Sequence, residues 1–317
     1  MNTANENKVL LEVENLSMHF RSGRGKNKIV VKAVDEVSFK VYEAETFGLV
    51  GESGCGKTTI GRTIIRIYNP TSGTVKYAGN EISGKLNAKL RRYLTDNMAM
   101  VFQDPIDSLN PRMTIEEIIS EGLRVRGIKD SNIIRNKVYE MLDKVGLTEE
   151  HSTRYPHEFS GGQRQRIGIA RSIIVSPKMI IADEPVSALD VSIQAQVINL
   201  LNDLKKELNL TIMFIAHDLS VVKYFSDRIG VMYYGKLVEI ARGDDLYKNP
   251  LHPYTRSLMS AIPQPNPLTE RRRVRLVYDP EADHDYSEEK PSMREIEDGH
   301  SVYCSESEYR KYLDIVH

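Results

Sequence analysis

A glycine-rich turn between an apolar strand and a helix constrains the fold of this chain more than any other feature. Residues 51–58 read Gly-Glu-Ser-Gly-Cys-Gly-Lys-Thr, directly after the apolar run Thr46–Val50 and before a helical pattern over residues 57–68. The turn matches G-x-x-x-x-G-K-[ST], in which glycines let backbone N–H groups approach phosphate oxygens at the N-terminus of a helix. It therefore predicts an α/β domain with a phosphate-binding loop.

The loop residues have different expected roles. Lys57 is expected to reach the β- and γ-phosphates of a nucleoside triphosphate, and Thr58 to coordinate Mg²⁺. The residues expected to contact the nucleotide are Gly51, Glu52, Ser53, Gly54, Cys55, Gly56, Lys57, Thr58 and Thr59. The alternative is an ordinary glycine-rich turn with a solvated lysine, which the strand before the turn and the helix after it disfavour.

The chain has two cysteines, Cys55 in the loop and Cys304 near the C-terminus. Their separation excludes a disulfide framework and a cysteine-rich metal site, and it fits a reducing compartment. Cys55 lies beside Lys57 and just before a helix N-terminus, and both positive fields favour a thiolate. We therefore expect a lowered pKa for Cys55 and alkylation of this thiol that bound nucleotide blocks.

Two adjacent acidic residues end a second apolar strand. The run Met179–Ala182 is followed by Asp183 and Glu184. A buried strand avoids carboxylates unless they face a ligand at its carboxyl end. Asp183 is therefore the candidate Mg²⁺ ligand, whereas Glu184 is expected to polarise a water that attacks the γ-phosphate. A solvated strand end with ordinary acids is the alternative, and the phosphate-binding loop weakens it.

Composition excludes several other classes of protein. Of the 317 residues, 40% are hydrophobic and 27% are charged, which is ordinary for a globular chain. The 43 Lys plus Arg and 44 Asp plus Glu give a net charge of -1, which argues against binding to a nucleic-acid backbone. The sequence has no signal-peptide pattern and no run of ~18 apolar residues. We therefore expect a soluble chain that can dock on a membrane protein.

The periodicity of the apolar residues changes along the chain. Residues 9–102 are rich in strand patterns, whereas Thr114–Leu147 has the 3.6-residue period of helices. From residue 161 to residue 225, helices and strands alternate as they do in a parallel sheet. Prolines at positions 263, 265 and 267 indicate a linker. The polar segment from about residue 268 onward has no pattern that predicts a fold.

The run Phe159-Ser160-Gly161-Gly162-Gln163 opens one of the predicted helices. Together with the loop and the acidic strand end, it resembles the ATP-binding-cassette (ABC) ATPases, whose signature usually reads Leu-Ser-Gly-Gly-Gln. Phe159 departs from that signature at its first position, which is expected to alter packing more than phosphate contact. The resemblance implies that Ser160, Gly161, Gly162 and Gln163 serve the nucleotide held by the opposite subunit.

Three further features match the same family in the expected order, at Gln103, Asp190 and His217. The resemblance implies that Gln103 contacts Mg²⁺ and relays to a membrane subunit, and that His217 contacts the γ-phosphate. Asp190 ends the run Ser187-Ala188-Leu189-Asp190, which matches the D-loop of the family. Phe20 lies where the family commonly stacks an aromatic ring on adenine, and a core residue of a strand is the alternative at that position.

Several longer runs narrow the resemblance to the oligopeptide and dipeptide permease ATPases. They are residues 102–113, 154–159, 183–196 and 249–255. The match is closest to the F-type oligopeptide subunits, covers about residues 8–265, and extends into a tail similar to that of Gram-positive bacteria. Many relatives carry several tail cysteines associated with an iron–sulfur cluster. This tail has only Cys304, so that cofactor is not expected.

The resemblance implies an α/β P-loop NTPase of the ABC ATPase type. Its RecA-like core would carry an antiparallel β subdomain formed largely by residues 1–80 and a helical subdomain over about residues 111–165. Residues 1–262 would form the nucleotide-binding domain, and residues 263–317 an oligopeptide-permease-type tail. ATP and Mg²⁺ would be the cofactors. The implied metal ligands are Thr58, Gln103 and Asp183, and the implied catalytic residues are Glu184 and His217.

The implied function is ATP hydrolysis that energises the import of oligopeptides across the cytoplasmic membrane. The implied partners are a homologous second ATPase subunit, two transmembrane permeases and an extracytoplasmic peptide-binding protein, with no nucleic acid. The chain would be peripheral, on the cytoplasmic face of the cell membrane. An importer of dipeptides, nickel or another small solute is one alternative. A non-transport ABC ATPase that acts on ribosomes or DNA is a remote alternative, because such proteins usually carry two cassettes or a coiled-coil insertion.

Overall fold

The computed structural model describes residues 8–23, 29–262, 274–287 and 289–316. The chain divides into two compact units, each built from several segments. The first unit holds Met1–Leu10, Val41–Glu45 and Gly84–Ile215, and the second holds Leu11–Lys40, Thr46–Ser83 and Ala216–His317. Each unit has its own strands and helices, and each carries some of the residues predicted to contact a nucleotide.

The described residues of the first unit include the parallel strands β6 (Met98–Val101), β7 (Met179–Asp183) and β8 (Thr211–Ala216), with β7 between the other two. Their side chains are almost all buried, as expected for parallel strands that are covered on both faces. Helix α7 (Val191–Leu208) connects β7 to β8 in the βαβ manner. The predicted alternation of strands and helices is therefore confirmed here.

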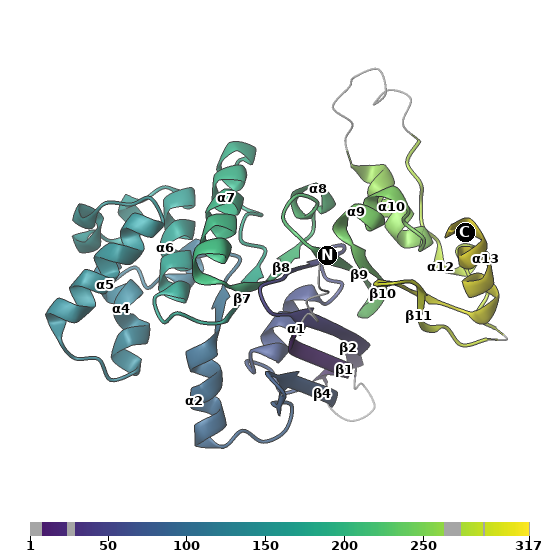
Figure 1. Cartoon of the computed structure of the whole chain (residues 1–317), viewed down its shortest axis with the longest axis horizontal. Coiled ribbons are helices and arrows are strands. Elements are labelled where there is room, and N and C mark those ends of the chain that lie inside the picture. Colours follow the sequence, from purple (N-terminus) through teal and green to yellow (C-terminus); the bar gives the residue numbers. More distant parts are fainter. Residues whose placement is uncertain (1–7, 24–28, 263–273, 288, 317) are drawn as a thin grey trace, which may run out of the picture. The chain divides into compact units, whose positions relative to one another are not determined.

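Helices α4 (Ile115–Val125), α5 (Ser131–Lys144) and α6 (Gly161–Ile173) pack on one another in the first unit (Figure 1, teal). The side chains that produced the 3.6-residue period are buried, namely Ile115, Ile118, Ile119, Leu123, Ile134, Val138, Met141 and Leu142. Thr114 caps α4, because its Oγ1 accepts the N–H of Glu117 and the Glu117 carboxylate accepts the N–H of Thr114. The predicted helical insertion is confirmed.

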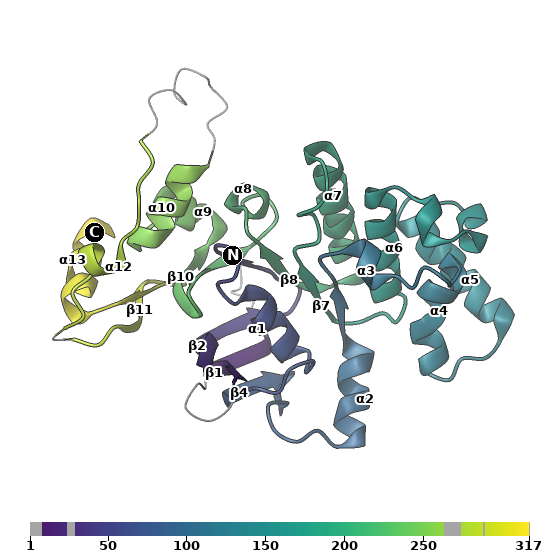
Figure 2. The ribbon, with the colours of Figure 1, turned by 180° about the vertical axis from the view of Figure 1, so that it is seen from behind.

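An antiparallel sheet occupies most of the first eighty residues. Strands β1 (Val9–Ser22), β2 (Ile29–Tyr42), β4 (Ser72–Tyr77) and β5 (Asn80–Glu81) follow the order β2-β1-β4-β5 (Figure 2, purple to blue). Strand β4 runs antiparallel to both β1 and β5, and Leu11 of β1 lies opposite Tyr77 of β4. Both of these side chains are fully buried. The sheet confirms the antiparallel layer that the sequence predicted.

The tail adds strands to a second sheet in the second unit. Strand β3 (Thr46–Val50) runs parallel to β9 (Arg228–Tyr233), and β9 runs antiparallel to β10 (Lys236–Arg242). Strand β12 (His300–Cys304) pairs with β10, and β11 (Ser292–Glu297) pairs with β12, both antiparallel. The sequence predicted no fold for this tail, because β11 and β12 are short and β11 reads Ser-Met-Arg-Glu-Ile-Glu, without a continuous apolar pattern.

The tail forms a small apolar core with Leu251, in which Leu251, Ile296, Val302, Cys304 and Tyr312 are buried. Tyr312 comes from helix α13 (Glu306–Val316).

The other helices of the described residues are α1 (Lys57–Ile64), α2 (Ala88–Asn97), α3 (Pro105–Ser108), α8 (Leu219–Val222), α9 (Gly243–Lys248), α10 (Pro253–Ala261) and α12 (Pro280–Asp283), with 3-10 turns at Glu149–Thr153 and Pro156–Glu158. Within the described ranges, no helix combines the length and the apolar character that crossing a membrane requires. The predicted boundary between residues 262 and 263 borders residues 263–273, which lie outside the described part of the chain.

Candidate functional site

The phosphate loop connects the buried strand β3 to helix α1 in the second unit. Gly51, Gly54 and Gly56 have φ angles of 151°, 81° and 109°, which favour glycine. A Cβ on Gly51 would lie 2.2 Å from the carbonyl oxygen of Met232, and a Cβ on Gly56 would lie 2.1 Å from that of Ala33. Gly56 is also the N-cap of α1, and a glycine has no side chain to accept from the first-turn N–H groups. The loop therefore fits an anion at the start of α1.

The side chain of Lys57 folds back on this loop and is only 3% exposed. Its Nζ donates to the carbonyl oxygens of Gly51 and Glu52 at 2.7 and 2.8 Å, and it lies 3.7 Å from the Sγ of Cys55. An ammonium group has three N–H donors, so it can hold the loop and also turn a donor towards a phosphate. Lys57 thus stabilises the shape of the loop, in addition to its predicted contact with a nucleotide.

The Cys55 thiol has a raised pKa, whereas the sequence predicted a lowered one. Its side chain is 6% exposed, and this burial raises the pKa of the thiol although the Lys57 ammonium acts in the opposite direction. The predicted lowering of the pKa is wrong, because the sequence reveals the neighbouring charge and not the burial that outweighs it. Burial also raises the pKa of Cys304 to about 12, so both thiols are expected to be protonated at neutral pH.

Phe20 lies near the end of β1 and is 38% exposed. Its ring meets Tyr68 edge to face, with the two ring centroids 5.4 Å apart. A core residue of a strand would be buried, so this alternative is excluded for Phe20. The exposed ring is compatible with stacking on a nucleobase, which stays a prediction.

The remaining predicted residues of the second unit are near the ends of their elements. His217 directly follows β8, and its side chain is exposed. Thr58 and Thr59 lie in the first turn of α1 and are half-buried. Thr58 thus lies in the helix turn whose N–H groups can receive an anion, and its predicted coordination of Mg²⁺ stays a prediction.

The two acidic residues at the end of β7, in the first unit, have different conformations. Asp183 is the last residue of the strand and is fully buried. Glu184 is half-buried and has a left-handed φ of 44°, while its N–H donates to the carbonyl oxygen of Ile215 at 3.0 Å. This conformation costs a residue other than glycine about 1 kcal/mol or more, and such strain concentrates at functional sites. The conformation therefore supports different roles for the two acids.

Gln103 contacts Glu184 directly, which the sequence analysis did not predict. The Nε2 of Gln103 donates to Oε2 of Glu184 at 3.2 Å. The register of the strands explains the contact, because Val101 of β6 lies opposite Ala182 of β7, and the two interacting residues each lie two positions farther along. Pairing these two strands from the sequence would have indicated the contact. The amide of Gln103 thereby orients the carboxylate of the candidate catalytic residue.

The turn that follows Glu184 is held by side chains from both of its ends. Ser187 Oγ donates to the carbonyl oxygen of Glu184 at 3.1 Å. Gln194 Nε2 donates to two carbonyl oxygens of the turn, at 3.1 and 3.0 Å. Asp190, the predicted D-loop residue, is the N-cap of α7 and is exposed. Gln194 was not predicted from the sequence, in which its one signal is its place four residues after Asp190, at the first turn of a helix.

The signature run starts helix α6 with its own side chains. Ser160 is the N-cap, and the N–H of Gln163 donates to Ser160 Oγ at 3.3 Å while the N–H of Ser160 donates to Gln163 Oε1 at 3.0 Å. Gly162 permits a close approach to α7, since a Cβ there would lie 2.5 Å from Cγ2 of Ile193. Phe159 is buried, as expected for a residue that packs. The contact of this run with a nucleotide stays a prediction.

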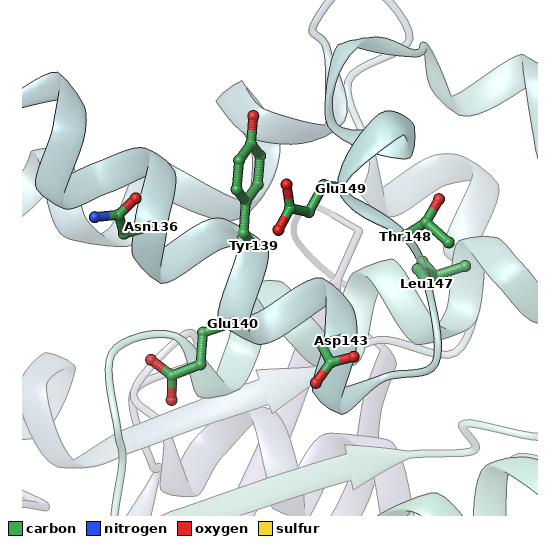
Figure 3. A pocket seen from close by; sticks show the side chains of 7 residues that line it. All are labelled: Asn136, Tyr139, Glu140, Asp143, Leu147, Thr148 and Glu149. Carbon is green, nitrogen blue, oxygen red and sulfur yellow. The ribbon is translucent and has the colours of Figure 1, made fainter.

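A surface cavity of about 540 Å³ in the first unit is a separate feature. Its lining residues are Asn136, Tyr139, Glu140, Asp143, Leu147, Thr148 and Glu149 (Figure 3). The carboxylates of Glu140, Asp143 and Glu149 make this cavity acidic. An acidic lining repels phosphate, so the cavity does not suit a nucleotide as the phosphate loop does.

The raised pKa of Cys55 predicts slow alkylation. At pH 8, iodoacetamide should modify Cys55 in the folded chain at least about ten times more slowly than in the urea-unfolded chain, because burial both restricts access and suppresses the thiolate. The rate in the folded chain should rise as the pH increases above 8, and nucleotide should slow it further. Peptide mass spectrometry identifies the modified cysteine. Equal rates in the folded and unfolded chains at pH 8 would contradict the burial of this thiol.

Two family models match successive parts of the chain. Residues 34–187 match the model described as "ABC transporter", and residues 238–288 match the model described as "Oligopeptide/dipeptide transporter, C-terminal region". The first match includes the phosphate loop, the signature run and both acidic residues at the end of β7. The second begins in β10 and reaches into the tail.

Proteins similar to this chain over almost their whole length carry related names. The oligopeptide transport ATP-binding protein OppF of Bacillus subtilis is 56% identical over 96% of this chain and 98% of its own. The dipeptide transport ATP-binding protein DppF of Lactococcus lactis is 51% identical over 97% of each chain.

A solved structure also resembles this chain. It is the dimeric ATP-binding cassette MJ0796 in a post-hydrolysis state bound to ADP and Pi, with a TM-score of 0.66 and 27% identity over 74% of this chain and 98% of that one. It agrees with the predicted α/β P-loop fold, which is confirmed. The chain thus belongs to the ABC transporter family, as an ATPase subunit of the group with the oligopeptide/dipeptide transporter C-terminal region.

Proposed function

We propose that this chain binds and hydrolyses ATP to energise an importer of oligopeptides across the cytoplasmic membrane. The observation that carries the proposal is the 56% identity to an oligopeptide transport ATP-binding protein, which extends over 96% of the chain and includes the tail. The chain also contains the residues proposed for hydrolysis, in the phosphate loop and at the acidic end of β7. The peptide itself need not touch this chain, whose task is to supply the driving force.

The donor groups of the candidate site fit Mg-ATP. The glycine cradle and the N-terminus of α1 suit phosphate oxygens, and the hydroxyl of Thr58 and the buried carboxylate of Asp183 are oxygen donors of the kind that Mg²⁺ prefers. Gln103 can serve two groups at once, because its Nε2 donates to Glu184 and its Oε1 is an acceptor suited to a metal. Mg²⁺, when bound, neutralises charge on the β- and γ-phosphates.

The residues around Glu184 suit the activation of a water molecule. The carboxylate receives a hydrogen bond from Gln103 at 3.2 Å, which restricts its rotation. The backbone of Glu184 is fixed on both sides, by its N–H bond to Ile215 and by the Ser187 bond to its carbonyl oxygen. A carboxylate that is held in place can accept a proton from a water aligned with the γ-phosphate. In the same proposal, His217 contacts the γ-phosphate and Phe20 stacks on adenine.

The proposed working unit contains two ATPase subunits. The similar cassette MJ0796 is described as a dimer. In our proposal, Ser160, Gly161, Gly162 and Gln163 face the phosphates bound by a homologous second ATPase, with Asp190 near the shared contact. Two transmembrane permeases and an extracytoplasmic peptide-binding protein complete the importer, and the chain is peripheral on the cytoplasmic face of the membrane.

A dipeptide importer is the second candidate function. The 51% identity to the Lactococcus lactis dipeptide transport protein DppF, over 97% of the chain, favours it specifically. The two candidates share the same ATPase chemistry and differ in the peptide length that the partner proteins accept. Transport measurements therefore decide between them.

Replacing Glu184 tests the proposed chemistry. Glu184→Gln keeps the shape of the side chain and removes its basicity, so ATP turnover should fall by about 100-fold or more while ATP still binds. Lys57→Ala should instead weaken nucleotide binding. Glu150→Gln, at an exposed position of a 3-10 turn, is the matched control and should retain full turnover. Phosphate release and equilibrium binding of ATP are measured. Near-normal turnover by Glu184→Gln would remove this residue from its proposed role.

Concentration dependence tests the shared site. The isolated chain should hydrolyse ATP slowly when dilute, and its specific activity should rise when the homologous second subunit is added. Ser160→Arg should abolish hydrolysis at the partner's phosphate loop, whereas Ser131→Arg, at the exposed start of α5, should not. Full-rate hydrolysis by a verified monomer would refute the shared site. Full activity of a homodimer would refute only the need for a second ATPase.

Peptide uptake tests the transport function. Cells that lack the gene for this chain should regain uptake of a labelled tetrapeptide when the wild-type chain or Glu150→Gln is supplied, and not when Glu184→Gln is supplied. Restored uptake of dipeptides alone would select the second candidate. Uptake of both peptides that is the same with and without the chain would refute peptide import altogether.

A further inference from the structure

One side chain of the oligopeptide/dipeptide-type C-terminal region reaches the phosphate loop. The hydroxyl of Tyr254, in α10, accepts a hydrogen bond from the N–H of Glu52 at 3.1 Å, although the two residues are 202 positions apart. Tyr254 is 2% exposed. We propose that Tyr254 is a positioning residue for nucleotide binding, through which the C-terminal region holds the phosphate loop in the shape that accepts ATP.

The bonded group is the peptide unit between Gly51 and Glu52. The N–H of this unit donates to Tyr254, and its carbonyl oxygen, on Gly51, accepts from Lys57 Nζ at 2.7 Å. One peptide plane is therefore held at both of its polar ends. The left-handed φ of Gly51 leaves this plane little steric restraint of its own, since glycine tolerates many conformations. Tyr254 and Lys57 supply the restraint, and rotation of the plane would break both bonds.

The same peptide plane determines where the Lys57 ammonium lies. Two of the acceptors around Lys57 Nζ are the carbonyl oxygens of Gly51 and Glu52, which belong to the two peptide units on either side of the Glu52 α-carbon. If the plane rotates, the Gly51 oxygen moves away and the ammonium follows a different set of acceptors. A hydroxyl on α10 thereby controls the position of the main cationic group of the phosphate loop.

Tyr254 is itself held firmly in place. Its ring packs against Tyr233 and Tyr278, with centroids 4.5 and 5.5 Å away. Its backbone N–H donates to Nδ1 of His252, the N-cap of α10, at 3.1 Å. Burial lowers the pKa of His252 to about 3, so this nitrogen remains a neutral acceptor at physiological pH. Helix α10 thus starts at a fixed point, and the tyrosine hydroxyl cannot drift from the loop.

The support extends to the strands of the tail. The carboxylate of Glu239, in β10, is fully buried and accepts the N–H groups of Leu251 and His252 at 2.8 and 3.1 Å. Nε2 of His300, in β12, lies 2.8 Å from the same carboxylate. A continuous series of hydrogen bonds therefore runs from the tail hairpin through Glu239, His252 and Tyr254 to the loop. The inference rests on nucleotide binding at residues 51–59 and adds a residue that supports it.

The test compares Tyr254→Phe with Tyr278→Phe in the full chain. Each variant removes one hydroxyl from the same aromatic cluster, and only the first removes the acceptor for Glu52. Losing one hydrogen bond of ordinary strength corresponds to about five-fold to ten-fold in affinity. We expect Tyr254→Phe to raise Kd and KM for ATP by that factor, with kcat changed less than about two-fold because Tyr254 does not touch the reacting groups. Tyr278→Phe should leave Kd unchanged.

Calorimetric binding and steady-state hydrolysis separate the outcomes, and melting without nucleotide reports on folding. An unchanged Kd for Tyr254→Phe would overturn the proposal, whether or not the melting temperature falls. An equal rise in Kd for both variants would also overturn it, because the ring cluster and not the hydroxyl would be responsible. The Kd of the wild-type chain for ATP is measured in the same experiment. A wild-type chain that does not bind ATP would refute the nucleotide site itself. A wild-type chain that binds ATP no better than Tyr254→Phe would refute only the role of Tyr254.

Hydrogen exchange provides a measurement that needs no variant. In the nucleotide-free wild-type chain, the Glu52 amide should exchange slowly, since its N–H is bonded to a buried hydroxyl. Exchange at the rate of an unfolded peptide would overturn the proposal even if Tyr254→Phe folds too poorly to assay.

Discussion

The bond between the Lys57 ammonium and the carbonyl oxygens of its own loop is the interaction on which the candidate site depends. Glycines at three positions bring those oxygens within reach of Nζ, and the buried strand β3 fixes where the loop begins. The loop is therefore shaped before any phosphate arrives, and binding need not pay the full cost of ordering it. The hydrogen bond that the Tyr254 hydroxyl accepts from the Glu52 N–H extends this preorganisation to helix α10, which follows the core strands in the chain.

Much of the fold was predictable because local pattern and burial agree. The apolar runs of β3, β7 and β8 are fully buried, and the 3.6-residue period over residues 114–147 corresponds to two amphipathic helices. The tail was not predictable in this way. Strand β11 alternates poorly and carries Arg294 and Glu295 in its centre. The hairpin that it forms with β12 joins the sheet through β10, about sixty residues earlier in the chain, and no local pattern indicates that partner.

The candidate site shows the same difference between features that a local sequence pattern predicts and features that depend on distant residues. Lys57 begins α1 and Asp183 ends β7, as their contiguous motifs predict, and their contacts with a nucleotide or metal stay predictions. Properties that depend on tertiary contacts were missed or predicted wrongly. The contact of Gln103 with Glu184 was missed because it follows from the register of two strands. The direction of the pKa shift of Cys55 was wrong because it depends on the burial of the thiol. A charge next in sequence is visible to the reader of a sequence, whereas desolvation is not.

The left-handed backbone at Glu184 sets stability against activity at a single position. Glycine would relieve the strain there, and asparagine would tolerate it better than most residues, yet both lack the carboxylate. Selection for a more stable domain alone would therefore replace Glu184, whereas in the proposed mechanism selection for turnover retains it. Sequence drift towards glycine or asparagine at this position would accordingly be a mark of subunits that have kept the fold and given up hydrolysis.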